Sequence, residues 1–577
     1  MSSGVVDPTE SETTDRAPTL RVRWIGRVPY REAFDLQVAL HEHAADDYLL
    51  LLEHPHVYTL GRNADPAHVL VPPASVGAEL VHTDRGGDVT YHGPGQLVGY
   101  PIVTLPEILP AGAAPTGEGS QGGMRDVVAY VRTVEGALID ALADLGIEAG
   151  RSEGYTGVWV GDEKIAAIGV RVARGRTRHG FALNVSTDPA MFGHIVPCGI
   201  SDRGVTSVEA LIGPIDMRTV VDAVTARFAE HFAYEVDRAD IVWRETTADL
   251  APFTRRAMAG EVPVRMLGRL REAGVTTDPA PNFERPEWMK VKANLGEEYR
   301  ELKKLTKGLN LHTVCEEAGC PNIYECWADR TATFMILGER CTRACGFCLV
   351  DTRKPLPPDP EEPAHVAEAV ATLGLEHAVI TCVARDDLPD GGAGAFAATV
   401  AAVRARSPRT KLELLISDCE GDAESLATIF ESRPDVLNHN IETVARLQRA
   451  ARPSANYARS LTVLARAKAA GLVTKSGIIV GMGESEAEVR QTVVDLRSVG
   501  VDILTVGQYL RPSAQHLPVA RWWTPDEFAS LKSFAEGLGF AHVECGPLVR
   551  SSYHAKRAEE GAAEAGVTTS LTLTSAS

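Results

Sequence analysis

The stretch CTRACGFC, from Cys341 to Cys348, holds three cysteines with the spacing C-x3-C-x2-C. Shortly before it, CEEAGCPNIYEC, from Cys315 to Cys326, holds three more with the spacing C-x4-C-x5-C. Cysteines at short, fixed spacings bring thiolates together around a metal centre, so both stretches predict metal binding. A structural zinc site more often shows paired C-x2-C knuckles that supply four ligands, whereas each group here has three cysteines. We therefore favour iron–sulfur clusters over zinc.

Composition limits the class of protein and its compartment. A chain of 577 residues is too long for one hydrophobic core, so we expect at least two domains. The 58 basic and 77 acidic residues give a net charge of −19, which does not favour nucleic-acid binding. No run approaches the roughly 18 uninterrupted apolar residues that predict a membrane span, and the polar N-terminus resembles neither a secretory signal nor a transit peptide. We expect a cytoplasmic protein, in which disulfides are disfavoured.

The pattern of apolar runs divides the chain into two α/β domains. Residues 21–235 and residues 286–556 both alternate strand-like runs with helical periodicity, and residues 236–285 between them end in a Pro-rich stretch that predicts a linker. In the second domain, strands alternating with helices predict a parallel sheet or partial barrel, with the active site at the carboxyl ends of the strands. Residues 1–20 are predicted to be a disordered tail and residues 557–577 a flexible one.

Two further features accompany the C-x3-C-x2-C cysteines. Phe347 precedes the last of them, and GIIVGMGE, from Gly477 to Glu484, fits the pattern G-x-I-x-G-x-x-E at the end of a predicted strand. Together they resemble the radical S-adenosylmethionine (SAM) superfamily. That resemblance implies a partial (β/α)6 barrel and a four-iron cluster with one iron open to SAM, which is cleaved to a 5′-deoxyadenosyl radical. It also implies cluster ligation by Cys341, Cys345 and Cys348, and cofactor binding by Gly477, Ile479, Gly481 and Glu484.

The other cysteine group is followed by Trp327, and the chain carries VRSSYHA near its end, with alanine at Ala555. With RPEWMKVK, VDTRKP and NHNIETV, these stretches resemble lipoyl synthase from Arg285 to Ala555. The resemblance implies insertion of two sulfurs, at C6 and C8 of an octanoyl chain that is amide-linked to a lysine, with two SAM molecules consumed. It implies a second four-iron cluster held by Cys315, Cys320, Cys326 and Ser552, although spacing alone does not choose between Ser551 and Ser552.

This chain departs from the family in the stretch TCVARDD, where Cys382 and Ala384 stand in place of the family's usual serine and aspartate. Cys419 and Cys545 are further cysteines outside the two groups. Because free cysteine behaves as a small apolar residue, we expect Cys382, Cys419 and Cys545 to be buried fillers and not ligands.

The N-terminal half carries RGGDVTYHGPGQLVGYPI, which begins at Arg85, and three later stretches: TGVWVGDEKIAAIGVRV, RHGFALNVS and FGHIVPCGISDRGVTS. In this order they resemble the octanoyltransferases of lipoate biosynthesis, with a biotin/lipoate ligase-like α+β fold, over residues Leu20 to Tyr234. The Gly- and Pro-rich stretch Ile108–Gly123 departs from the family and is predicted to be a surface loop, either a lid or without function.

Cys198 is the only cysteine before residue 315, and it lies between Pro197 and Gly199, an unusual place for a buried filler. The resemblance implies that Cys198 and Lys164 form a catalytic dyad. Cys198 would carry the octanoyl group as a thioester, and Lys164 would favour the thiolate and accept a proton. The resemblance also implies that glycine N–H groups are oxyanion donors and that His92 and His179 lie along the substrate pocket. The residues implied to bind substrate are Arg85, Gly86, Gly87, Asp88, Val89, Thr90, Tyr91 and His92, then Ala167, Ile168 and Gly169, then Gly180, Phe181 and Ala182.

Alternatives remain for both halves. The N-terminal half could be an ATP-dependent lipoate ligase or a non-catalytic carrier-docking module, and the C-terminal half a zinc- or cluster-stabilised structural domain or a biotin-synthase-like enzyme. The resemblance implies an acyl carrier protein as octanoyl donor, a reductant protein, and lipoyl domains of 2-oxoacid dehydrogenases and the glycine cleavage H protein as acceptors. Carrier domains are commonly acidic, so we predict a basic docking surface that includes Lys290, Lys292, Lys303, Lys304 and Lys307.

Overall fold

The computed structural model describes residues 17–106, 126–197, 203–241, 264–275, 286–289, 312–313 and 331–569. Several predictions lie outside these residues: the first part of the N-terminal tail, the whole Ile108–Gly123 insertion, Cys198, the three cysteines of the C-x4-C-x5-C group, and all five lysines of the predicted docking surface. The described residues form two compact units. One comprises Met1–Val22, Asp46–Leu51 and Tyr58–Arg238, and the other Arg23–Ala45, Leu52–Val57 and Ala239–Ser577.

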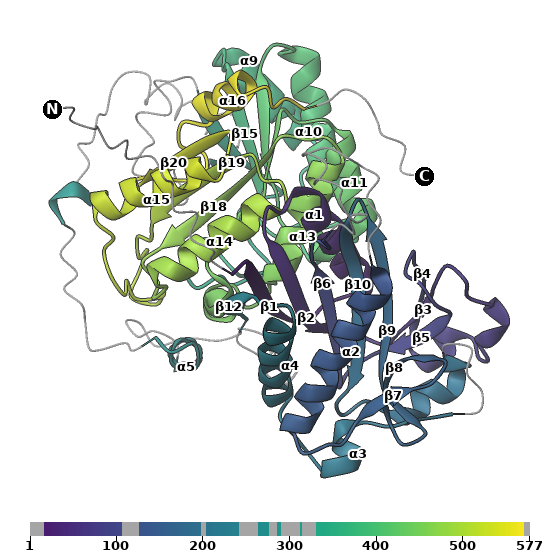
Figure 1. The fold of residues 1–577 in the computed structure, drawn as a ribbon. Coiled ribbons are helices and arrows are strands. Elements are labelled where there is room, and N and C mark those ends of the chain that lie inside the picture. The colour runs from purple at the N-terminus through teal and green to yellow at the C-terminus, as the bar shows by residue number, and fades with distance from the viewer. Residues whose placement is uncertain are drawn as a thin grey trace, which may run out of the picture. The chain divides into compact units, whose positions relative to one another are not determined.

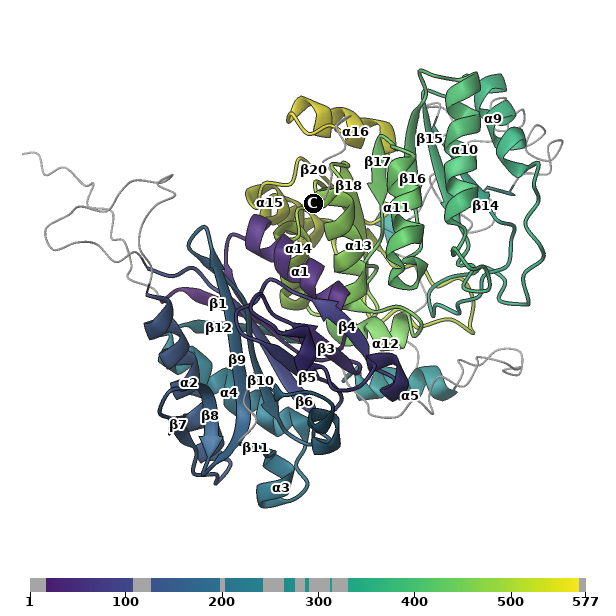
Figure 2. The same ribbon diagram turned by 90° about the vertical axis from the view of Figure 1, so that its right-hand side faces the viewer.

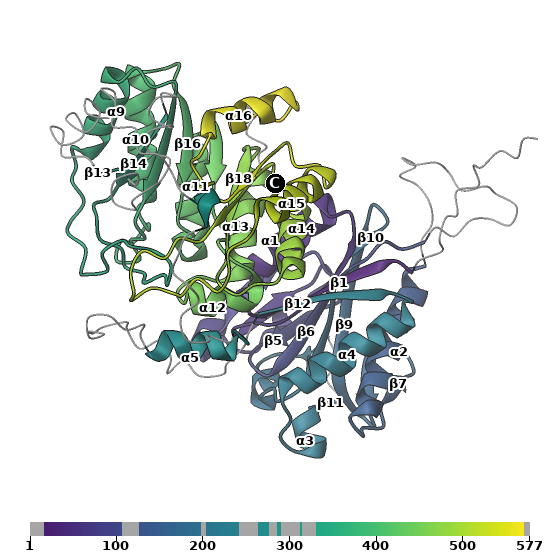
Figure 3. The same cartoon turned by 90° about the vertical axis from the view of Figure 1, so that its left-hand side faces the viewer.

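The first unit is built around a nine-stranded sheet (Figure 1). Its strand order is β12 (Glu235–Asp240), β1 (Thr19–Arg27), β2 (Asp47–Glu53), β6 (Gln96–Ile102), β10 (Arg176–Asn184), β9 (Glu163–Ala173), β8 (Tyr155–Val160) and β7 (Gly150–Ser152), with β11 (Gly204–Val205) paired to β9. Figure 3 shows α2 (Val127–Asp144) and α4 (Met217–His231) side by side against this sheet. A second sheet joins β4 (Glu79–His82), β3 (Val57–Leu60) and β5 (Val89–His92).

The second unit is built around an open sheet of eight strands, in the order β13 to β20 (Figure 2). The strands are β13 (His312–Thr313), β14 (Thr331–Ile336), β15 (His377–Cys382), β16 (Lys411–Leu415), β17 (Val436–Asn438), β18 (Thr474–Val480), β19 (Ile503–Gln508) and β20 (His542–Gly546). From β14 onward every neighbouring pair is parallel, whereas β13 runs antiparallel to β14. The predicted parallel α/β architecture is confirmed.

Helices join the parallel strands of this sheet. The helices between successive strands are α9 (Glu362–Thr372), α10 (Ala393–Arg406), α11 (Ala423–Glu431), α13 (Tyr457–Ala469), α14 (Glu486–Ser498) and α15 (Pro525–Gly537). Helices pack against the sheet, and β14 is buried throughout. Parallel strands all end at the same edge, so the loops that follow β14, β15, β16 and β17 lie together there.

Two predicted boundaries need correction. The linker, residues 236–285, contains most of β12 and also α5 (Val264–Glu272), whose Met266 and Leu270 are buried. The predicted flexible tail, residues 557–577, contains most of α16 (Ala555–Glu564), because Ala555, Ala558 and Ala562 form one apolar stripe that packs on β20. Composition alone concealed this stripe, since alanine contributes little to apparent hydrophobicity. Among the described helices, none combines the length and apolar character needed to cross a bilayer.

An ion pair is buried within the strands of the second unit. Lys475 Nζ lies 3.0 and 2.9 Å from the two carboxylate oxygens of Glu413, and neither side chain is exposed. Asn438 Nδ2 donates to the same carboxylate at 2.8 Å. Burial alone would raise the pKa of Glu413, but Lys475 and His377 outweigh that effect and lower the pKa to about 2. Lys475 and His377 therefore favour the charged form of the buried Glu413 carboxyl group.

Lys475→Met is expected to destabilise the protein by about 3 to 5 kcal/mol, because it leaves the Glu413 carboxylate buried without its cation. Lys411→Met is the matched control, since Lys411 is half exposed on β16, the strand that carries Glu413, and its ion pairs with Asp435 and Glu559 are worth at most about 1 kcal/mol. Urea unfolding measures both variants. If both variants lost the same free energy of unfolding, the buried pair would contribute no more to stability than the exposed ion pairs do.

Candidate active sites

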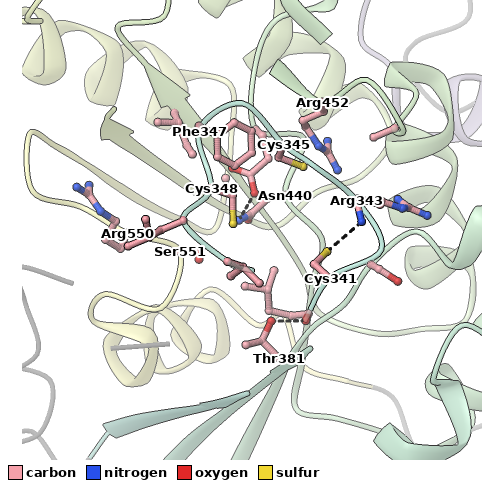
Figure 4. A pocket seen from close by; sticks show the side chains of 18 of the residues that line it. Cys341, Arg343, Cys345, Phe347, Cys348, Thr381, Asn440, Arg452, Arg550 and Ser551 are labelled. Atoms are coloured by element: carbon pink, nitrogen blue, oxygen red, sulfur yellow. Dashed lines mark hydrogen bonds between the residues drawn. The ribbon is translucent and has the colours of Figure 1, made fainter. Parts of the chain in front are cut away.

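The C-x3-C-x2-C cysteines line a cavity of about 960 Å³ in the second unit (Figure 4). They lie on the loop that follows β14, and the cavity wall continues through residues after β15, β16 and β17. Cys345 and Cys348 point toward the same space as Asn440 and Arg452. The cavity therefore lies at the carboxyl edge of the parallel sheet, as the sequence predicted.

Backbone hydrogen bonds hold the cysteine loop against its surroundings. Cys341 N donates to Asp351 O at 2.8 Å, and Thr342 N donates to Ala384 O at 3.0 Å. Gly346 N donates to Ala451 O at 2.8 Å. Since Ala384 contributes its carbonyl group, its difference from the family's aspartate does not remove this anchor.

Arg343, between the first two cysteines, fixes the loop through its side chain. Its Nε and Nη2 atoms donate to the carboxylate of Asp386 at 2.8 and 2.7 Å, and Nη2 also donates to Asp418 Oδ1 at 2.6 Å. Burial opposes the charge on Arg343, but the two carboxylates raise its pKa well above the ordinary value. One guanidinium thus ties the cysteine loop to the loops after β15 and β16.

The three thiols suit a four-iron cluster. Burial raises the pKa of Cys345 to about 12 and that of Cys348 to about 11, so iron binding must release their protons. In the described part of the chain, no three His, Cys, Asp or Glu side chains lie close enough to hold a single metal ion. A four-iron cluster needs no such closeness, because each thiolate binds a separate iron.

The cavity also contains polar residues that the sequence analysis did not single out. Asn440 Nδ2 donates to the Glu442 carboxylate at 3.1 Å, and burial raises the pKa of Glu442. Asn440 Oδ1 and Asp418 Oδ2 are buried at the cavity wall and accept no hydrogen bond from the described residues. These atoms suit a polar ligand such as SAM. The polar run NHNIE directly after a predicted strand was the available signal.

In the Gly-rich stretch, two of the four predicted cofactor-binding residues line the cavity and the other two lie outside it. Gly477 and Ile479 line the cavity, whereas Gly481 and Glu484 do not. The Glu484 carboxylate accepts hydrogen bonds from Gly481 N, from Met482 N at 2.9 Å and from Trp523 Nε1 at 3.0 Å. Glu484 therefore holds the turn that presents Gly477 and Ile479, and it does not face the cavity itself.

The remaining cysteines and serines also divide into residues that line the cavity and residues that do not. Cys419 lies in an apolar core cluster and Cys382 packs against it, as predicted for fillers, although Cys382 also reaches the cavity wall. Ser551 lines the cavity. Ser552 is half-buried and is not among the lining residues, so its predicted ligation stays a prediction.

Arg343→Met is expected to lower the iron content and the rate of SAM cleavage per chain by at least about tenfold, because the cysteine loop loses the guanidinium that binds the buried Asp418 and the partly exposed Asp386. Arg406→Met is the control, since Arg406 forms an exposed ion pair with Glu368 between α10 and α9. Iron analysis and 5′-deoxyadenosine release measure both variants. Full iron loading of the Arg343 variant would contradict this role.

The candidate site of the first unit is centred on Lys164, at the start of β9. Its Nζ lies 4.8 Å from the centre of the Trp159 ring, a distance at which a cation is attracted to the ring face. β11 pairs with β9 so that Val205 is opposite Lys164, and Thr206 N donates to Lys164 O at 3.1 Å. The strand that follows the Pro-Cys-Gly stretch is therefore held beside Lys164. Lys164 is also the only lysine among the first 289 residues, a signal that the sequence analysis missed.

The predicted substrate segment that begins at Arg85 divides into core and site residues. In β5, successive side chains point to opposite faces, and Val89 and Tyr91 lie in an apolar core cluster. Thr90 and His92 therefore share the other face. Arg85 is an anchor, because its Nη2 donates to Thr59 O at 2.6 Å and its Nη1 donates to Gly86 O at 3.0 Å.

The other predicted segments lie on β9 and β10, where Gly169 pairs with Gly180 and Ala167 with Ala182. At Gly180 an added Cβ would lie 2.2 Å from Gly99 O, so this glycine is needed for close packing against β6 and not for space beside a ligand. His179 Nε2 lies 2.6 Å from Asp84, which also binds Arg178 and Arg171. Burial lowers the pKa of His179, and Asp84 opposes this shift.

An open parallel α/β sheet with a three-cysteine loop after its first parallel strand defines the second unit as a radical SAM domain. Residues 335–496 match the radical SAM superfamily, and residues 273–320 match the N-terminal domain of lipoyl synthase. Residues 29–229 match the lipoyl protein ligase A/B catalytic domain. The chain belongs to the lipoyl synthase family and is an enzyme. It also carries the lipoyl protein ligase A/B catalytic domain.

Two relatives and one solved structure are similar to parts of this chain. Lipoyl synthase of Mycobacterium ulcerans is 53% identical over 314 residues, which are 54% of this chain and 96% of that protein. Lipoyl synthase of Rubrobacter xylanophilus is 58% identical over 280 residues, which are 48% of this chain and 87% of that protein. A solved structure of a putative lipoate protein ligase from T. acidophilum, Ta0514, is 18% identical with a TM-score of 0.31 and covers 39% of this chain and 89% of its own.

Proposed function

We propose that the chain catalyses two consecutive steps of lipoate assembly in the cytoplasm. The first unit would transfer octanoyl from an acyl carrier protein to a lysine of a lipoyl domain, and the second would insert sulfur at C6 and C8 of that octanoyl group. The observation that carries this proposal is the union, in one chain, of a ligase A/B-type domain and a lipoyl synthase-type domain. The product of the first step is the substrate of the second, and joining the two domains raises the effective concentration of the intermediate.

In the first step, the Cys198 thiolate attacks the octanoyl thioester, and the carrier leaves as a thiolate that takes the proton held by Lys164. The lysine amine of the lipoyl domain then attacks the new thioester, and Lys164 accepts the amine proton. The position of β11 beside Lys164 supports this pairing. A cavity of about 390 Å³ has walls that include Phe192, Ile195 and Pro197, and such apolar walls suit an alkyl chain.

In the second step, Cys341, Cys345 and Cys348 would hold the cluster that binds SAM, while Asn440 and Glu442 would bind its polar groups. When bound, the cluster and SAM supply a carbon radical that can remove hydrogen from an unactivated C–H bond. Cys315, Cys320, Cys326 and Ser552 would hold a second four-iron cluster as the sulfur source. The electron comes from a reductant protein, and the acceptors are lipoyl domains of 2-oxoacid dehydrogenases and the glycine cleavage H protein.

The test is the mass of an apo lipoyl domain after anaerobic incubation with the reconstituted protein and octanoyl-acyl carrier protein, with and without SAM and reductant. We expect octanoylation in both reactions and two added sulfurs only with SAM and reductant. Octanoylation that requires ATP and free octanoate would instead assign the first unit as a ligase. If no acyl group is transferred under either condition, the first unit is a docking module.

A further inference from the structure

Arg452 brings a buried positive charge to the wall of the cysteine cavity in the second unit. It lines the cavity together with Cys345, and Figure 4 shows the two side chains beside each other. Burial raises the pKa of Cys345, and the charge of Arg452 is the strongest influence that opposes this shift. The same holds for Glu442, another residue of the cavity wall. Arg452 is therefore placed to offset negative charge at this end of the cavity.

A buried row of polar groups holds the Arg452 side chain. Arg452 Nη1 donates to Ile441 O at 2.9 Å and to Ser460 Oγ, on α13, at 3.4 Å. The same Ser460 Oγ lies 3.1 Å from His439 Nε2. His439 directly follows β17, and its Nδ1 lies 3.0 Å from Ile416 O, directly after β16. The side chains of Arg452, Ser460 and His439 are all buried, so the row is shielded from solvent.

Each hydrogen bond in this row has one direction. A carbonyl oxygen can only accept, so Ile416 O requires a hydrogen on His439 Nδ1. Burial and the nearby charge of Arg452 lower the pKa of His439 to about 4, so the ring is neutral at pH 7 and Nε2 accepts the Ser460 O–H group. The Ser460 oxygen then accepts from Arg452, which can only donate. Every group in the row is matched, and the guanidinium group is fixed at its Nη1 end.

We propose that His439 and Ser460 are positioning residues that hold the Arg452 guanidinium group beside Cys345, where its charge raises the reduction potential of the cluster bound by the cysteine loop. This inference rests on the proposed function, because it requires that cluster. When the reductant protein gives up one electron, the cluster site gains one negative charge and no proton moves. A positive charge fixed nearby stabilises the reduced state more than the oxidised state.

The backbone also links Arg452 to the cysteine loop. Gly346, the residue after Cys345, donates its N–H group to the carbonyl oxygen of Ala451, the residue before Arg452, at 2.8 Å. Arg452 N in turn donates to Gln448 O at 2.6 Å. The charge and the cysteine loop are therefore held together by contacts that need no bound SAM. We expect the effect on the reduction potential to be present before SAM binds.

The test is an anaerobic redox titration of the reconstituted full chain without SAM, followed by the EPR signal of the reduced cluster. The signal is assigned to the cysteine-loop cluster by the change that added SAM causes in it. For Arg452→Met, we expect the equilibrium constant for one-electron reduction to fall at least about tenfold, which lowers the midpoint potential by at least about 59 mV. Ser460→Ala should lower the midpoint by less, because Ile441 O still holds Arg452.

Two further variants separate charge from packing. Arg452→Lys keeps the positive charge and should recover most of the potential lost in Arg452→Met. Thr399→Val is the matched control for Ser460→Ala, because Thr399 is a buried hydroxyl residue on α10 whose Oγ1 donates to Ala395 O at 2.8 Å, and it does not line the cavity. It should leave the midpoint unchanged. A variant that is only less stable would bind less iron per chain, but the cluster that remains would keep its midpoint.

An unchanged midpoint in Arg452→Met would overturn the proposal, as would an equal fall in Arg452→Lys and Arg452→Met. In either case a SAM-responsive cluster is still present, so the proposed radical function stands and only the role of Arg452 is lost. If the unaltered chain binds no cluster whose signal responds to SAM, the proposed radical function fails, and this inference fails with it. The two failures are therefore distinguishable.

Discussion

Cys345→Ala is expected to abolish reductive cleavage of SAM, lowering 5′-deoxyadenosine release by at least about a thousandfold. Cys345 lines the large cavity with Cys341 and Cys348, and the C-x3-C-x2-C loop has no fourth cysteine to replace it. Loss of one ligand should also remove most of the iron bound by this loop. The measurement is 5′-deoxyadenosine release under anaerobic reduction, together with iron content per chain.

Cys545→Ala is the matched control for this variant. Cys545 is a half-buried thiol whose pKa is raised by burial to about 12, but it lies on β20 and is not among the residues that line the cavity. We expect Cys545→Ala to retain iron and SAM cleavage, and both variants to retain acyl transfer by the first unit. SAM cleavage that survives in Cys345→Ala would remove the cysteine loop from the radical chemistry.

Lys164→Met is expected to slow octanoyl transfer by about 100-fold to 10,000-fold, the range for removal of a general acid–base group. Its buried position over Trp159 and beside β11 leaves little room for another cation to take its place. The measurement is single-turnover transfer of octanoyl to an apo lipoyl domain. Radical chemistry in the second unit should be unaffected.

Lys164→Arg separates the two roles proposed for this lysine. Arginine keeps the positive charge that favours the Cys198 thiolate but cannot act as a proton acceptor. We therefore expect Lys164→Arg to retain more octanoyl-enzyme formation than Lys164→Met, while transfer to the lipoyl domain fails in both. Arg174→Met, on the exposed turn between β9 and β10, is the control expected to behave like the unaltered chain. Full transfer activity in Lys164→Met would exclude the dyad.

The sequence by itself determined the features that depend on spacing and periodicity. Alternating strands and helices predicted the parallel sheet of the second unit, and C-x3-C-x2-C predicted a cysteine loop at its carboxyl edge, because both patterns reflect neighbours along the chain. The resemblance that indicated Lys164 and the segment that ends at His92 likewise rested on short stretches of sequence. The family assignments followed from such short stretches.

Only the tertiary structure decided which side chains work together over long sequence distances. Arg343 meets Asp386 and Asp418 because the loops after β14, β15 and β16 end at one edge. Gln96 meets Asn184 because β6 and β10 are paired, although 88 residues separate them. Strand register and hydrogen-bond direction set these contacts, and neither is a property of local sequence.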